Sequence, residues 1–182
     1  MGYKSTGLVF REKPSIGIEP ARLYNAIRDG THGTYTAITD KQFPSGLWVR
    51  TFNGSTSIID CGDQVTARAI GFWLNPDSTS ESILEEVDDT GVTISSGTIV
   101  YGSWDNCFVD AVDTDTITTG WHQLFLTSTT NVDVSAFRLG LVNATFFAGD
   151  MAPLLRIYKT FAPSQGQIKR IFDYENAKWF GV

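Results

Sequence analysis

Residues 65–77 read Val65-Thr66-Ala67-Arg68-Ala69-Ile70-Gly71-Phe72-Trp73-Leu74-Asn75-Pro76-Asp77 and contain the longest strand that the sequence predicts. Apolar, β-branched and aromatic side chains dominate from Val65 to Leu74, and these residue types favour the pleated sheet. The strand is expected to end at Asn75-Pro76-Asp77, because Asn and Asp favour turns and proline lacks a backbone N–H. The stretch therefore predicts a long β-strand followed by a turn.

Shorter strands are predicted on both sides of this stretch. Asn53-Gly54 is typical of a hairpin between the predicted strands Leu47–Phe52 and Ser57–Ile59. A short helix is predicted over Glu19–Gly30, and Pro163-Ser164 opens a second helical segment. Many short strands with one or two short helices indicate an all-β, two-sheet sandwich. The predicted shorter strands are Leu47–Phe52, Ser57–Ile59, Ser82–Val87, Val92–Ser95, Thr98–Tyr101, Cys107–Val112, Trp121–Thr127, Ala136–Val142 and Leu154–Tyr158.

Length and composition exclude several classes of protein. The chain has 182 residues, of which 42% are hydrophobic and 19% charged, so we expect one domain with a full core rather than a disordered chain. The formal net charge is −6, which leaves no basic excess to neutralise phosphates, and nucleic acid is not an expected partner. No apolar run is long enough to predict a transmembrane helix, and residues 1–6 lack the apolar region of a secretion signal.

Charge is distributed unevenly along the chain. Between Ala69 and Phe137 there are eleven acidic residues and no Lys or Arg, so this part carries −11 while the remainder carries +5. Such asymmetry predicts head-to-tail association or the binding of one end to an acidic partner. The alternative interpretation is that acidic loops keep a β protein in solution.

Five segments carry a family resemblance: Phe52-Asn53-Gly54-Ser55, Ala69–Pro76, Gly120-Trp121-His122-Gln123-Leu124, Ala148–Tyr158 and Phe161–Ile168. Taken in order, they resemble the laminin-G-like branch of the concanavalin-A-like jelly rolls. The resemblance covers residues 47–172 and implies an antiparallel jelly-roll sandwich over residues 47–182. Residues 1–46 have no counterpart and are expected to form an N-terminal extension or docking segment. The sequence departs from the family at Pro153 and Leu154, which stand where it often has an acid.

The resemblance implies binding of carbohydrate or protein rather than catalysis, because this fold hosts many functions. Sugar binding uses an exposed aromatic face beside hydrogen-bonding side chains. One loop offers both, and its candidate residues are Tyr101, Trp104, Asp105 and Asn106. The alternative for Trp104 is that its ring packs over the edge of a sheet.

Calcium is the one metal that the resemblance suggests, and no cofactor is required. Calcium takes six to eight oxygen ligands, so carboxylates from two loops would have to converge. The alternative is that these acidic loops are simply solvated. The candidate ligands are Asp88, Asp89, Asp113 and Asp115.

Catalytic patterns are weak, and we expect no enzyme. Glucanases of this superfamily carry acids at alternate positions of one strand, roughly E-x-D-x-x-E, but here Gly91 replaces the third acid after Glu86 and Asp88. His122 is expected to be paired or half-exposed rather than catalytic. The two cysteines, Cys61 and Cys107, match no metal spacing, and we expect them reduced, with one disulfide as the alternative.

Three functions follow, in order of preference. The first is a non-catalytic surface protein of a bacteriophage virion, a capsid decoration or fibre-type protein with a lectin-like face, because a binding fold without an export signal can be released by lysis. Its partners would be virion proteins and cell-surface glycans, and a homo-oligomer is compatible with it. The second is an extracellular or cell-surface carbohydrate-binding or adhesion module of a bacterium, and the third is a glycoside hydrolase. Trp179 and Phe180 either fold back on the sandwich or anchor to a partner.

Overall fold

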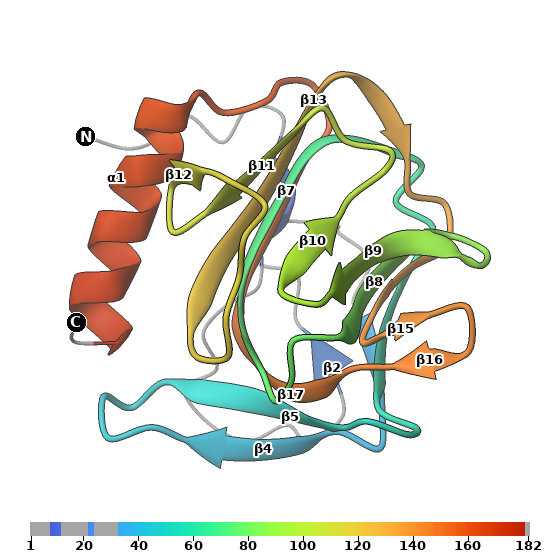
Figure 1. Cartoon of the computed structure of the whole chain (residues 1–182), viewed down its shortest axis with the longest axis vertical. Helices are drawn as coiled ribbons and strands as arrows, with labels where there is room; N and C mark the ends of the chain where they lie inside the picture. The colour runs from blue at the N-terminus through green and yellow to red at the C-terminus, as the bar shows by residue number, and fades with distance from the viewer. Residues whose placement is uncertain (1–7, 12–21, 24–32, 181–182) are drawn as a thin grey trace.

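The computed structural model describes residues 8–11, 22–23 and 33–180, and they form two large antiparallel sheets with one helix (Figure 1). Neighbouring strands of the eight-stranded sheet follow the order β12-β11-β13-β7-β17-β5-β4, and β1 pairs with β17. The bounds of these strands are β12 (Val112–Asp113), β11 (Asn106–Val109), β13 (His122–Asp133), β7 (Thr66–Pro76), β17 (Ala148–Tyr158), β5 (Trp48–Asn53), β4 (Thr39–Gln42) and β1 (Leu8–Arg11).

The second sheet has seven strands in the order β10-β9-β8-β14-β6-β3-β2. The prediction of an all-β sandwich is therefore confirmed, whereas the jelly-roll connectivity stays a prediction. The strands of this sheet are β10 (Thr98–Val100), β9 (Thr90–Ser95), β8 (Glu81–Val87), β14 (Phe137–Leu139), β6 (Ile58–Gly62), β3 (Gly33–Thr36) and β2 (Arg22–Leu23), and a separate ribbon pairs β15 (Leu141–Val142) with β16 (Thr145–Phe146).

Strand β7 lies inside the eight-stranded sheet, between β13 and β17. Ile70, Phe72 and Leu74 point into the core between the sheets. Ala69 and Trp73 are buried on the opposite face, in two further apolar clusters. Because both faces of β7 are covered, its sequence is a continuous apolar run rather than an alternation of apolar and polar residues.

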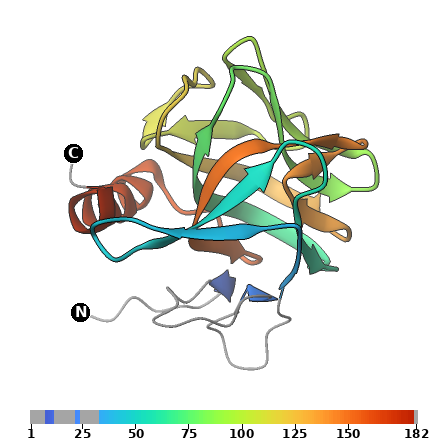
Figure 2. The same ribbon diagram turned by 90° about the horizontal axis from the view of Figure 1, so that it is seen from below.

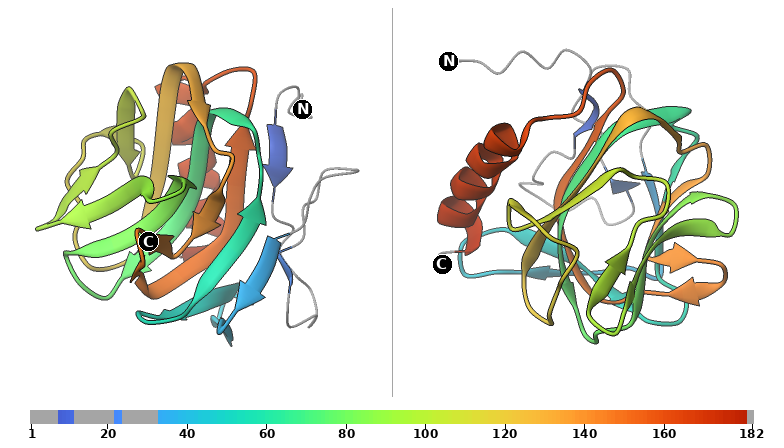
Figure 3. Two further views of the ribbon diagram at one scale, coloured as in Figure 1. Left: turned by 90° about the vertical axis from the view of Figure 1, so that its right-hand side faces the viewer. Right: turned by 45° about the horizontal axis from the view of Figure 1, so that its top comes forward.

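The opposite face of this sheet is covered by α1 (Gln165–Glu175), which continues into a π-helical turn, η1 (Asn176–Phe180). Figure 1 and Figure 3 show α1 along the outside of the sheet, so the molecule has three layers. Ile168, on α1, is fully buried and packs against Phe125 and Tyr158 of the sheet. The backbone N–H of Ser164 donates to Gln167 Oε1 at 2.8 Å and caps the first turn, so the predicted start of this helix is confirmed.

The predicted hairpin at Asn53-Gly54 is wrong, because β5 and β6 belong to different sheets. The turn instead carries the chain from one sheet to the other. Asn53 Oδ1 accepts hydrogen bonds from the backbone N–H groups of Ser55, Thr56 and Ser57 at 2.9–3.1 Å. Asn-Gly supplied the turn chemistry that the chain needs there, but turn chemistry alone does not decide which strands pair.

Residues 1–46 contribute to the sandwich wherever the structure describes them. Strand β3 pairs with β6, and β4 pairs with β5, so neither sheet breaks at residue 46. Figure 2 shows β1 and β2, in blue, along one side of the sandwich. The helix predicted over Glu19–Gly30 is wrong at Arg22 and Leu23, which form β2, and its other residues lie outside the described part of the chain. A docking role for this segment stays a prediction.

Within the described residues, neither helical segment has the length and apolar character needed to cross a lipid bilayer.

Gly71→Ala is expected to lower the free energy of unfolding by about 1–3 kcal/mol. A Cβ atom at Gly71 would lie 2.2 Å from the ring of Phe125, which is buried and pairs with it across β7 and β13. Denaturant titration measures the loss. Gly102→Ala is the matched control, because its Cβ would have no atom within 4 Å. Equal losses in the two variants would contradict this packing.

Candidate functional site

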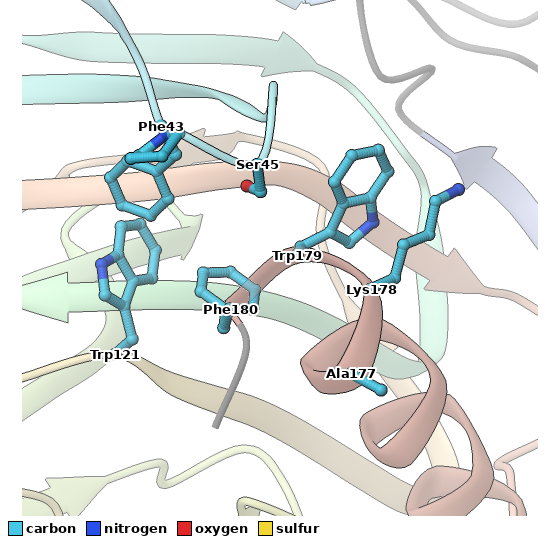
Figure 4. Close-up of a pocket in the computed structure, with 8 residues that line it drawn as sticks. Phe43, Ser45, Trp121, Ala177, Lys178, Trp179 and Phe180 are labelled. Atoms are coloured by element: carbon cyan, nitrogen blue, oxygen red, sulfur yellow. The ribbon is translucent and has the colours of Figure 1, made fainter.

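A pocket of about 620 Å³ opens between the β4–β5 turn and η1, at one end of the face that α1 covers. Four of the eight lining residues are aromatic, and Figure 4 shows them on both sides of the opening. Phe43 and Trp121 lie on one side, Trp179 lies on the other, and Phe180 lies between them. The remaining lining residues are Pro44, Ser45, Ala177 and Lys178.

The first wall is a tight turn. The backbone N–H of Phe43 donates to Leu47 O at 2.8 Å, and that of Gly46 donates to Phe43 O at 2.9 Å. Gly46 has φ of +87°, a left-handed conformation that glycine adopts without steric cost. These bonds hold Phe43, Pro44 and Ser45 at a fixed position beside β5.

Phe43, Trp121 and Phe180 contact one another at an angle rather than stacked face to face. The centroids of Phe43 and Trp121 are 5.3 Å apart at 89°, and those of Trp121 and Phe180 are 5.1 Å apart. Phe180 also stacks on the buried Trp73 at 4.2 Å. The aromatic rings that line the pocket are therefore continuous, through Phe180, with the buried Trp73 beneath the helical segment.

A buried carboxylate attaches the second wall to the sheet. Glu175, at the end of α1, is 1% exposed and accepts a 2.7 Å hydrogen bond from the indole N–H of Trp73. Gln123 donates to the same oxygen at 3.2 Å, and Arg156 forms an ion pair with the other. Since η1 begins directly after Glu175, this network fixes where Trp179 and Phe180 lie.

The structure brings the two predicted docking residues back onto the sandwich. Trp179 and Phe180 are both half-buried and pack against the apolar cluster that contains Leu47, Trp73 and Leu154. Of the two alternatives left open by the sequence, the fold-back is observed. Because both side chains also line the pocket, their role in binding a partner stays a prediction.

The predicted sugar-stacking role of Trp104 is wrong. Its side chain is 5% exposed, belongs to the core between the sheets, and donates its indole N–H to Glu86 Oε1 at 2.5 Å. Tyr101 is half-buried and packs against the same core. A buried ring has no free face for a sugar, so the loop does not form the expected platform.

The two polar residues of that loop hold its shape. Asp105 accepts hydrogen bonds from the backbone N–H and hydroxyl of Thr129 at 2.7 and 2.5 Å. The hydroxyl bond is the main reason that the pKa of Asp105 is lowered. Asn106 donates to Thr127 Oγ1 at 3.3 Å. Their polar groups therefore serve the loop's own structure.

The predicted calcium ligands lie in two separate loops. Asp88 and Asp89 form the β8–β9 turn, where Asp88 is 83% exposed beside Arg138 at 3.7 Å. Asp113 ends β12, and Asp115 follows it, with its carbonyl accepting from the Ile99 N–H at 2.8 Å. In the described part of the chain, no group of three or more His, Cys, Asp or Glu side chains is placed to hold a metal ion.

The weak catalytic candidates are all engaged in structural contacts. Glu86 is buried against Trp104, whereas Asp88 points outward, so they do not face one groove. His122 Nδ1 lies 2.7 Å from Asp110 Oδ2, and its Nε2 lies 3.1 Å from Thr118 Oγ1, as the prediction of a paired histidine requires. Cys61 and Cys107 are both buried and are not joined by a disulfide, as the prediction of a reduced pair requires.

The sequence did not predict the pocket. Trp121 stands at the start of a predicted strand, and Phe43 belongs to no predicted strand or helix. The available signal was local: an apolar Trp179-Phe180 pair near the end of the chain and a Pro44-Ser45-Gly46 turn after Phe43. Nothing in residue spacing indicates that these two segments meet.

Comparison with protein-family models finds no match for the chain, and comparison with curated proteins finds none either. The resemblance to laminin-G-like jelly rolls therefore stays a prediction, and the site rests on its geometry.

Glu175→Gln is expected to lower the free energy of unfolding by about 3 kcal/mol, because it leaves the Arg156 guanidinium without its counter-charge in a buried position. Denaturant titration of the variant measures this loss. Asp173→Asn is the control: it removes the same charge from the same helix, but its pair with Lys169 is exposed and is worth less than about 1 kcal/mol. Similar losses in both variants would show that Glu175 does not anchor the helix.

Glu86→Gln is expected to stabilise the protein increasingly as the pH rises. Burial raises the pKa of Glu86 above its ordinary value of 4.5, and the hydrogen bonds from Ser103 and Trp104 offset this effect only in part. The folded state therefore holds this proton more tightly than the unfolded chain, so Glu86 costs stability as the pH rises from 4.5 through the folded pKa. Gln resembles the protonated form and avoids this cost.

The measurement is the difference in unfolding free energy between Glu86→Gln and the parent protein, from about pH 4 to about pH 8. The difference should grow in favour of the variant and then level off above the folded pKa. A difference that does not change with pH would mean that Glu86 is not desolvated.

Proposed function

We propose that the chain is a non-catalytic carbohydrate-binding β-sandwich and that the aromatic pocket is its binding site. The observation that carries this proposal is the clustering of Phe43, Trp121, Trp179 and Phe180 around one opening, with Ser45 and Lys178 at its rim. Sugars bind proteins through apolar ring faces that stack on aromatic side chains and through hydroxyls that hydrogen-bond nearby polar groups. The lectin-like face is thus assigned to this pocket instead of the Tyr101–Asn106 loop.

The chemistry of the lining favours binding over hydrolysis. Glycoside hydrolysis uses two carboxyl groups on either side of the bond that is cleaved. None of the eight lining residues is an Asp or Glu, and the nearby Glu175 is buried beneath them in an ion pair. A third-ranked role as a glycoside hydrolase therefore has no support at this site.

We further propose a virion surface as the setting, with a bacterial adhesion module as the alternative. This part of the proposal rests on the resemblance to lectin-like jelly rolls and on the acidic middle of the chain, whose charge suits a solvent-facing surface. Mass spectrometry of purified particles from the source of this chain tests it. Stoichiometric presence supports the virion assignment, and absence from particles favours the adhesion module.

Trp179→Ala is expected to weaken saccharide binding by about tenfold, because it removes one stacking surface of the pocket. A glycan array identifies the ligands, and isothermal titration calorimetry of the purified protein measures their affinity. Asn106→Ala is the control from the loop that the sequence indicated, because Asn106 pairs with Thr127 in the middle of β13 and does not line the pocket. The control should bind as the parent does.

Three results would change the assignment. Equal loss in both variants would move the site away from the pocket, and loss in Asn106→Ala alone would restore the loop. A blank array would overturn carbohydrate binding and leave a protein-docking role.

A parallel series in EDTA tests calcium at Asp88, Asp89, Asp113 and Asp115. Loss of saccharide binding in EDTA supports such a site, and unchanged binding argues against one.

A further inference from the structure

Lys178 is the one charged residue among the eight that line the pocket. Its ammonium nitrogen lies 4.3 Å from the ring centroid of Trp179 and 5.6 Å from that of Tyr174. It also donates a 3.4 Å hydrogen bond to the Tyr174 hydroxyl, a neutral acceptor. Cation–π contacts with both rings hold the charge at the rim of the aromatic opening.

Of the four lysines that the structure describes, Lys41 and Lys169 pair with carboxylates, Lys159 and Lys178 do not, and Lys178 is the one that lines the pocket. Lys41 pairs with Asp150 at 2.6 Å, and Lys169 pairs with Asp173 at 2.8 Å. Lys178 forms no ion pair with any residue that the structure describes, although the whole chain has a net charge of −6. An unneutralised positive charge beside an apolar surface attracts an anion more strongly than one in open solvent.

The hydrogen-bonding chemistry of the lining points in the same direction. Lysine and tryptophan side chains donate hydrogen bonds but accept none, and phenylalanine, proline and alanine do neither. Ser45 Oγ is therefore the one side-chain acceptor among the eight lining residues. A neutral sugar presents hydroxyl groups that need both donors and acceptors, whereas a carboxylate or sulfate group needs donors alone.

We propose that the ligand of this pocket is an acidic saccharide, whose ring packs on Trp179 and whose anionic group pairs with Lys178. The inference rests on the proposed carbohydrate-binding function and specifies the class of sugar. The shared chemistry is a saccharide ring with an attached anion. Uronic acids and sialic acids supply it as a carboxylate, and sulfated sugars supply it as a sulfate.

The test compares acidic and neutral saccharides of matched structure by isothermal titration calorimetry of the whole protein. Oligogalacturonate is paired with its carboxyl-reduced form, sialyllactose with lactose, and a sulfated galactose oligomer with its desulfated form. We expect at least one acidic member to bind about tenfold more tightly than its neutral partner, the factor expected for one charge-assisted hydrogen bond. Added salt should reduce this preference. The preferred pair distinguishes the three sources of the anion.

Lys178→Met is the decisive variant, since it keeps most of the apolar stem and removes the charge. Its affinity for the acidic saccharide should fall about tenfold relative to its affinity for the neutral partner, so that the preference is lost. Lys178→Arg should retain the preference. Lys169→Met is the control, because it removes the same charge from an exposed position of α1 outside the pocket.

The outcomes separate this inference from the function beneath it. Equal affinity for acidic and neutral partners, or equal loss in Lys178→Met and Lys169→Met, overturns the acidic ligand and leaves carbohydrate binding intact. No measurable binding of any saccharide overturns both. Preference for an acidic partner that disappears in Lys178→Met alone supports both.

Discussion

The indole of Trp73 links the sheet, the helix and the pocket. Its ring stacks on Phe172 at 5.5 Å and on Phe180 at 4.2 Å, both nearly parallel to it, and its N–H donates a hydrogen bond to Glu175. A tryptophan on the outer face of a central strand would expose a large apolar surface unless another layer covered it. The helical segment that covers it also supplies one wall of the pocket.

Two kinds of polar contact divide the outer layer. Beneath the helix, the Glu175 carboxylate is buried and bound to Trp73 and Arg156, so it holds the end of α1 against the sheet. At the rim, Lys178 is held by aromatic rings and keeps its charge available. The first contact gives the pocket a fixed shape, and the second is the basis of the proposed preference for an acidic ligand. Fixed shape is valuable in a binding site because ordering costs are then met during folding rather than on ligand binding.

The fold class and much of the strand pattern could be predicted from the sequence, and the site could not. Ile70 and Phe72 stand in a continuous apolar run, and such a run predicts a strand that is covered on both faces. Pairing across the sheets depends on long-range geometry, so Asn53-Gly54 indicated a turn without revealing that it changes sheets. Trp104 illustrates the same limit: a Trp in a polar loop gives no sign of whether its ring points inward, and here Glu86 accepts its N–H inside the core. Phe43 and Phe180 meet only because α1 folds over β7.

The layered arrangement also separates the molecule into parts of different local stability. The core between the two sheets contains no residue of α1 or η1, so the helical layer can open without disturbing it. A ligand in the proposed site would contact both the β4–β5 turn and η1, which line the pocket, and would bind only when that layer is closed. Ligand binding and closure would therefore be thermodynamically linked, and a bound ligand would slow hydrogen exchange along all of α1, including its first turns, which do not line the pocket.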